Sequence, residues 1–135
     1  MGLAERRALK AFQDEHYPGL KQALDQAAGF ELALEVRWDT LAVPEYAHLY
    51  AEAFPKVYFQ PLAAALSDIA RDDMGKAALK AGLKRVVVCN TADKYGQGAF
   101  TFEGGVLTLD HSPVTNLDDV ELRKGALVKL LEGAL

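Results

Sequence analysis

Asp110, His111 and Ser112 place an acid, an imidazole and a hydroxyl side by side, directly after a predicted strand. In hydrolytic enzymes an acid orients a histidine, and the histidine activates a nucleophile. That chemistry requires three side chains converging on one point, whereas neighbours along a strand point to opposite faces. The pattern therefore favours a structural interpretation, in which His111 lies at the rim of a sheet and Asp110 is exposed.

Cys89 is the other candidate for nucleophilic chemistry, because it lies at the end of the apolar run RVVVCN, where loops often carry function. A reactive thiol needs a lowered pKa and a nearby base, which His111 supplies if the two strands are neighbours. The alternative function is therefore a small hydrolase or metal-assisted enzyme. In it, Cys89 or a bound water is the nucleophile, His111 is the base and the loop 90–98 lines the site. Buried cysteines are more often inert, so we favour a protein without catalysis.

A weak metal-binding pattern occurs at Glu45, His48 and Glu52, which a helix would place on one face. The Glu-x-x-His spacing occurs in di-iron bundles, but those sites need a second such motif, which this sequence lacks. A solvated helix face is the favoured interpretation, and we predict no bound metal. We also predict no cofactor, because neither FEGGV nor DKYGQG matches a phosphate-binding glycine loop.

Aromatic residues are concentrated between positions 46 and 59. This density is typical of a core between helices and a sheet, which is the favoured interpretation. Tyrosines with a hydrated hydroxyl are also common at binding surfaces, so three of them are candidate contact residues. The segment contains Tyr46, Tyr50, Phe54, Tyr58 and Phe59, and the candidates are Tyr46, Tyr50 and Tyr58.

Composition limits the classes of function. A chain of 135 residues fits one domain, 1–135, and half of its residues are apolar. The net charge of -4 argues against nucleic acid and anionic membranes as partners, and no apolar run approaches the ~20 residues of a membrane span. The single cysteine cannot form an internal disulfide, which predicts a reducing, cytoplasmic location.

Hydrophobic periodicity predicts the elements that position these residues. A helical pattern covers residues 4–28, with a kink or break at Pro18 and a stop at Gly29. The nine residues FELALEVRW, 30–38, alternate strictly and predict a half-buried strand. Pro44 is expected to open the next helix, and Pro55 and Pro61 to divide the segment after it into short helices.

The remaining pattern predicts a helix capped by Asp72 or Asp73, the strand RVVVCN, a hairpin at Gly104-Gly105 and a final helix over 117–132, capped by Asn116. The expected fold is a two-layer α+β domain, with a mainly antiparallel sheet of about four strands packed on helices. The order of elements is α-β-α-α-α-β-β-β-α.

One face of this sheet is predicted to stay polar. Burying its charges under helices would cost several kcal/mol each, so the face should meet water or a polar partner. The sequence therefore predicts a small non-enzymatic binding or adaptor domain, which binds a protein partner or a second copy of itself. The polar side chains on this face are Glu31, Glu35, Arg37, Thr101, Glu103, Thr108 and Asp110.

Overall fold

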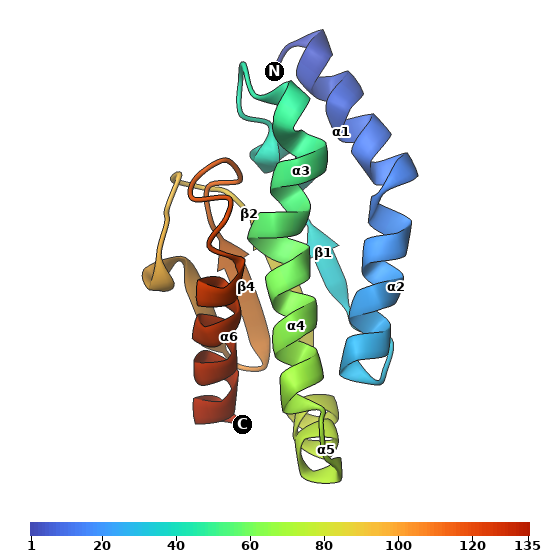
Figure 1. Ribbon diagram of the computed structural model, residues 1–135, viewed down its shortest axis with the longest axis vertical. Coiled ribbons are helices and arrows are strands. Elements are labelled where there is room, and N and C mark those ends of the chain that lie inside the picture. Colours follow the sequence, from blue (N-terminus) through green and yellow to red (C-terminus); the bar gives the residue numbers. More distant parts are fainter.

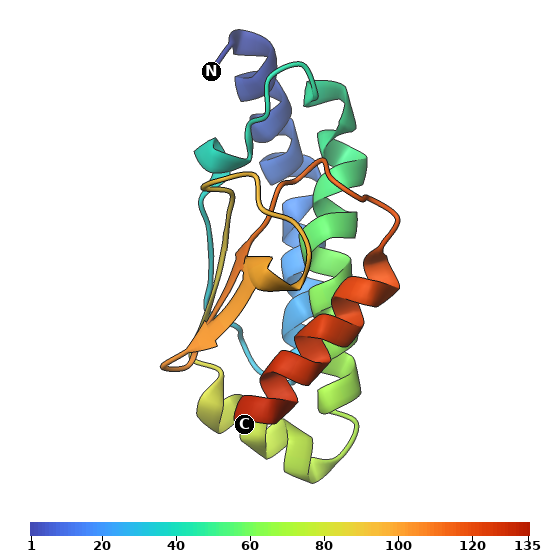
Figure 2. The same cartoon turned by 90° about the vertical axis from the view of Figure 1, so that its left-hand side faces the viewer.

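The computed structural model describes residues 1–135, except for the side chain of Gln97. A four-stranded sheet forms one layer and the long helices form the other, on one face of the sheet (Figures 1 and 2). The helices are α1 (Leu3–Glu15), α2 (Tyr17–Ala28), α3 (Tyr50–Phe54), α4 (Gln60–Ile69), α5 (Asp73–Gly82) and α6 (Val120–Ala134), and the strands are β1 (Leu34–Val36), β2 (Arg85–Cys89), β3 (Phe100–Glu103) and β4 (Val106–Asp110).

The sheet is mixed, so the prediction of a mainly antiparallel sheet is wrong. Its order is β1-β2-β4-β3, and both β1-β2 and β2-β4 are parallel. Only the β3-β4 hairpin is antiparallel, with Gly104 and Gly105 at φ 59° and 82° in its turn, as predicted. β3 lies at the outer edge of the sheet, and β4 lies between β3 and β2 and runs parallel to β2.

The N-terminal helices follow the predicted pattern. α1 ends at Glu15 and α2 begins at Tyr17, so the break lies next to Pro18, which occupies the first turn of α2. Proline is tolerated there because that amide has no partner within the helix. Gly29 ends α2 in the left-handed conformation, with φ 86°.

Strand β1 is shorter than predicted, because only Leu34 to Val36 pair with a neighbour. The alternation nevertheless extends beyond the paired residues. Leu32 is buried, and Phe30 and Trp38 pack against the core from outside the strand. The period of two thus identified the buried face correctly but overestimated the length of the ladder.

The prolines at 55 and 61 do not separate helices, contrary to the prediction. Helical turns run without interruption from Ala47 to Ile69, through α3, a π-helical segment Pro55–Phe59 and α4. In a π turn the hydrogen bonds join residues five positions apart instead of four. This change of partners accommodates a proline, which has no amide proton to donate. The result is one long element through the centre of the helix layer, with α2 and α6 as its neighbours (Figure 1).

Of two predicted N-terminal helix caps, one is confirmed and the other is wrong. Asp72 caps α5 as predicted, and its side chain accepts a hydrogen bond from the Gly75 amide at 2.8 Å. Asn116 does not cap α6, because it adopts φ 54° and α6 begins at Val120. The turn before α6 is thereby longer than predicted.

The core lies between the sheet and the helix layer. Phe12, Phe54 and Phe59 form an aromatic cluster there, with the Phe12 and Phe54 rings 5.0 Å apart and edge to face. The aromatic-rich segment therefore fills the core, which was its favoured interpretation. In the part of the chain that the structure describes, no helix has the length and apolar character needed to cross a membrane.

Candidate functional site at the end of strand β4

The end of β4 directs two ionisable side chains to opposite sides of the sheet. Asp110 is in register with Cys89 and shares its face, which the helices leave open. His111 comes directly after it and turns toward the helix layer, where its ring packs on Phe100 with centroids 5.8 Å apart. In open α/β sheets, ligands commonly bind beyond the carboxyl ends of parallel strands, and both residues occupy such an end.

Asp110 anchors the loop after β2. Its carboxylate accepts hydrogen bonds from the Thr91 amide at 2.8 Å, from the Thr91 hydroxyl at 2.5 Å and from the Lys94 ammonium at 3.1 Å. Partial burial opposes ionisation, but these bonds outweigh it and hold the pKa of Asp110 below its usual value. Asp110 is therefore an ionised structural acceptor.

Cys89 is buried beside this carboxylate. Burial raises the pKa of the Cys89 thiol, and the negative charge of Asp110 raises it further. A thiol with a raised pKa remains protonated at neutral pH and is a poor nucleophile. The positive charges of Arg37 and Lys94 lower this pKa, but burial and Asp110 outweigh them, so the site does not activate the cysteine.

His111 is almost fully buried, with 2% of its surface exposed. Its Nδ1 lies 2.6 Å from the carbonyl oxygen of Ser112, and the Tyr58 hydroxyl donates to the carbonyl of His111 itself. Because a carbonyl only accepts, Nδ1 carries the proton and Nε2 is the unprotonated nitrogen of the neutral ring. Burial lowers the pKa of His111, and the nearby charge of Arg123 lowers it further.

The structure does not bring Cys89 and His111 together. The thiol lies on the open face of the sheet, and the imidazole lies on the face that the helices cover. Asp110 shares the face of Cys89 and is likewise separated from the His111 ring. The sheet therefore stands between the nucleophile and the base of the hydrolase hypothesis.

Arg123 of α6 is a candidate site residue that the sequence analysis missed. It is 5% exposed, and its guanidinium donates to the carbonyls of Thr115 at 2.8 Å, of Asn116, and of Lys56 at 3.4 Å. A signal was present in the sequence, because Arg123 lies four residues before the buried Leu127 and so on the same helix face.

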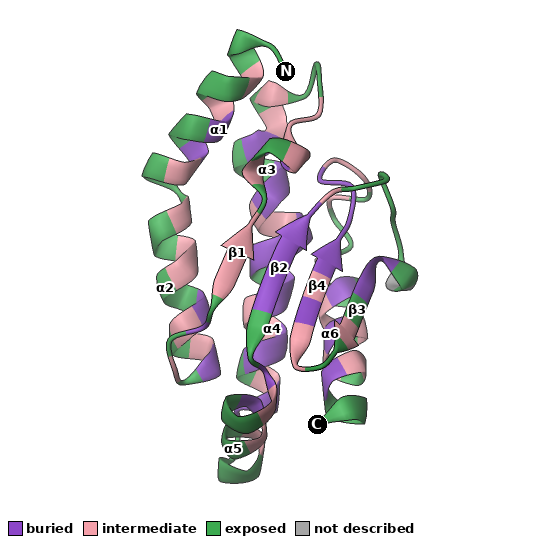
Figure 3. Ribbon diagram, turned by 180° about the vertical axis from the view of Figure 1, so that it is seen from behind, coloured by how far each residue is buried: buried purple, intermediate pink, exposed green. Residues whose placement is uncertain are grey.

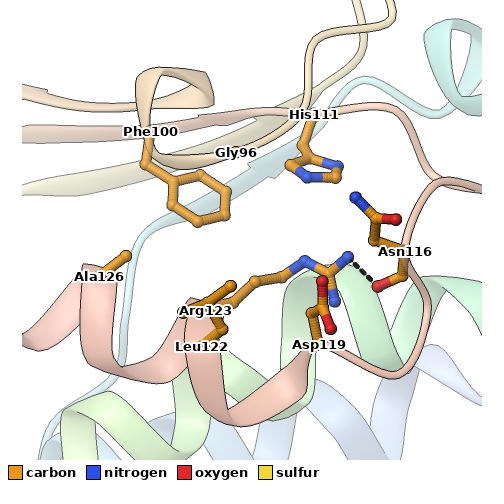
Figure 4. Close-up of a pocket in the computed structure, with 8 residues that line it drawn as sticks. All are labelled: Gly96, Phe100, His111, Asn116, Asp119, Leu122, Arg123 and Ala126. Carbon is orange, nitrogen blue, oxygen red and sulfur yellow. Dashed lines mark hydrogen bonds between the residues drawn. The ribbon is translucent and has the colours of Figure 1, made fainter.

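A cavity of about 90 Å³ lies between the end of β4 and the start of α6. Figure 4 shows the His111 ring and the Arg123 side chain extending into this space from opposite walls, with Phe100 beside them. The cavity is lined by Gly96, Phe100, His111, Asn116, Asp119, Leu122, Arg123 and Ala126.

The predicted contact tyrosines differ in exposure. Tyr46 is 42% exposed, whereas Tyr50 and Tyr58 are buried, so only Tyr46 can be reached by a partner of the folded chain. The hydroxyl of Tyr50 donates to the Val43 carbonyl at 2.9 Å, which explains how this polar group is tolerated near the core.

The acidic and basic candidates on the sheet lie where the alternation placed them. Glu31 is exposed just before β1, and Glu35 and Arg37 form an ion pair of 2.7 Å on the open face. Glu35 also lies 3.4 Å from Arg85 of the neighbouring strand. The register places Glu35, Val87, Thr108 and Thr101 in one row across this face.

The candidate metal ligands do not share a helix face. Glu45 lies before the helical turns, with φ 72°, while His48 and Glu52 lie within them. Glu52 instead forms a long contact with Lys56, at 3.8 Å. Among the described residues, no three His, Cys, Asp or Glu side chains are grouped closely enough to hold a metal ion.

No protein-family model matches the chain, and neither the search of curated proteins nor the search of solved structures finds a match.

Proposed function

We propose that the protein is a non-enzymatic binding module whose open sheet face binds a second copy of the same chain. The observation that carries this proposal is that the long helices cover one face only, so the other face is available to a partner (Figure 3). The side chains at the centre of that face are closely packed: Val87 and Cys89 are buried there, and Val106 and Thr108 are half-buried. Charged side chains surround this centre.

The charges on the two sides of the face are complementary. On the side of β1 and β2, Arg37 and Arg85 outnumber Glu35. On the side of β3, Glu103 is exposed and forms no ion pair with any residue the structure describes. A two-fold axis parallel to the strands would lay β1 and β2 of one copy over β3 and β4 of the other. This arrangement brings Arg85 next to the partner's Glu103.

A second copy suits this face better than a strongly acidic or basic partner. Lys94 lies 3.1 Å from Asp110, and Glu35 contacts both of its neighbouring arginines, so most charges on the face are already balanced. The side of β1 and β2 keeps a net positive charge and Glu103 on β3 is unpaired, and such a self-complementary surface favours association with itself. The lone cysteine, which has no disulfide partner, supports a reducing compartment such as the cytoplasm.

The geometry of the site does not support the hydrolase hypothesis. It needs the Cys89 thiol and the His111 imidazole within hydrogen-bond reach, and these groups lie on opposite faces of the sheet.

Sedimentation velocity on charge-reversal variants tests the proposal. We expect the native chain to form a dimer that weakens as salt is raised, because exposed ion pairs are screened. Arg85→Glu and Glu103→Arg should each shift the equilibrium toward monomer. The double variant should restore the dimer, since it exchanges the two charges across the interface.

Arg6→Glu is the matched control, because Arg6 is exposed on α1, outside the proposed interface. It should leave the dimer intact. A chain that stays monomeric at high concentration would overturn the proposal, as would single reversals that behave like the control.

A further inference from the structure

The cavity beside β4 has a buried floor and an exposed rim. Phe100, His111 and Arg123 form the floor, and each is at most 6% exposed. Asn116 and Leu122 belong to the rim and are open to solvent. A water molecule needs roughly 10–15 Å³ of such space, so a volume of about 90 Å³ has room for a small ion of several heavy atoms.

Arg123 gives this cavity a positive charge that no carboxylate contacts directly, although the charge of Asp119 on the rim acts on the guanidinium. No Asp or Glu oxygen lies within 4.0 Å of its guanidinium among the residues that the structure describes. Its bonds go to main-chain carbonyls instead, which orient the group without neutralising it. Buried charges are normally paired, because an isolated charge is costly in a low dielectric. A buried cationic side chain on a cavity wall therefore favours the binding of an anion in that cavity.

His111 supplies a second polar contact from the opposite wall. Its Nδ1 is engaged by Ser112, so Nε2 is the nitrogen left for a ligand. Two nearby charged groups shift the pKa of His111 in opposite directions. Arg123, across the cavity, disfavours the imidazolium, while Asp110, on the other face of the sheet, favours it. Asp119 lies on the exposed rim, where solvent screens its charge.

We propose that this cavity binds a small monocarboxylate, with one oxygen on the guanidinium of Arg123 and the other on Nε2 of His111. The short aliphatic end of the ligand would lie against Phe100 and Ala126, which form the apolar part of the wall. Binding places a negative charge beside the imidazole, so a proton from solvent joins Nε2 as the anion enters. Affinity should therefore rise as the pH falls toward the range where histidine titrates. The proposal is independent of the dimer, because the cavity lies on the opposite side of the sheet.

Imidazole NMR with acetate as the probe tests this site. The chain contains three histidines, so His16 and His48 serve as internal references within the same sample. We expect acetate to raise the pKa of His111, relative to chloride at equal ionic strength, and to leave the imidazole signals of His16 and His48 in place. If acetate moves the His111 signal no more than the signals of His16 and His48, the proposal fails.

A pair of neighbouring variants separates binding from folding. Ala126→Leu places three extra carbons against the cavity while leaving the hydrogen bonds of Arg123 in place, and it should weaken acetate binding at least tenfold. Gly125→Ala is the matched control, since its new Cβ meets no atom within 4 Å, and it should bind acetate like the native chain. Undiminished binding by a folded Ala126→Leu protein would also overturn the proposal.

Discussion

A single carboxylate, that of Asp110, joins the end of β4 to the loop after β2 through three hydrogen bonds. Asp110→Ala removes all three and leaves the Thr91 amide without its acceptor, which should cost about 2–3 kcal/mol of the free energy of unfolding. Urea denaturation measures that loss. Asp118→Ala is the control, because that side chain is 93% exposed and its ion pair with Lys56 should contribute little. Equal effects of the two substitutions would contradict the anchoring role.

Residue-scale prediction succeeded where it depended on local geometry. The period of two along β4 was enough to predict that Asp110 and His111 face opposite ways. The prediction that Asp110 is exposed was wrong, because only 9% of the residue is exposed. The pairing of Cys89 with Asp110, by contrast, depends on two strands far apart in the sequence meeting in one register, which no local pattern specifies. Arg123 was missed because its burial arises from contacts with carbonyls in a distant helical segment and in the preceding turn.

Two helical glycines should respond in opposite ways to the same substitution. In α6, Gly125→Ala should stabilise the protein by about 0.5–1 kcal/mol, because alanine restricts the unfolded chain and its Cβ meets nothing within 4 Å. In α5, a Cβ at Gly75 would lie 1.7 Å from the carbonyl oxygen of Ile69, so Gly75→Ala should destabilise by about 1–3 kcal/mol. Thermal and urea unfolding of both variants provide the measurement. Stabilisation by Gly75→Ala would show that α5 does not pack so closely on the end of α4.

Element boundaries were predictable where a residue type forces the backbone. Gly29 and the Gly104-Gly105 pair occupy left-handed conformations, and each ends or turns an element where the sequence indicated. Pro55 was misleading, because a proline disrupts a regular α-helix but not every helical geometry. Its neighbours Phe54 and Phe59 are buried, and packing against the core favours continuing the helix through a π turn.

For the whole molecule, the two layers could be predicted but the strand order could not. Alternation along 30–38 and the hairpin at 104–105 define buried faces, and burial demands a helix layer on one side. The position of β4 between β2 and β3 is decided by contacts across the whole domain. Because β4 lies there, β2 has a parallel strand on each side, and Val86 and Val88 pair with both. A central position of this kind is typical of a strand that is apolar on both faces.

Acid should weaken the whole fold in two stages. Burial lowers the pKa of His111 from its ordinary 6.5, so below pH 6.5 the unfolded chain binds more protons than the folded one and the free energy of unfolding falls. The pKa values of Asp25 and Asp110 lie below the usual 3.8, so their contribution is present above that pH and is lost as the pH drops through the folded values. Urea unfolding from pH 8 to pH 3 measures both stages.

The first stage can be assigned with histidine variants in chloride buffers. His111→Gln should remove most of the loss between pH 7 and pH 5, because glutamine does not titrate and its amide can still donate to the Ser112 carbonyl. His16→Gln, at an exposed position between α1 and α2, should retain the loss of the native chain. A native protein whose stability rises on acidification from pH 8 to pH 6, with a rise that His111→Gln abolishes, would show that the imidazole is charged in the folded state. The cavity would then hold two positive charges facing each other, which is the arrangement expected only when an anion already lies between them.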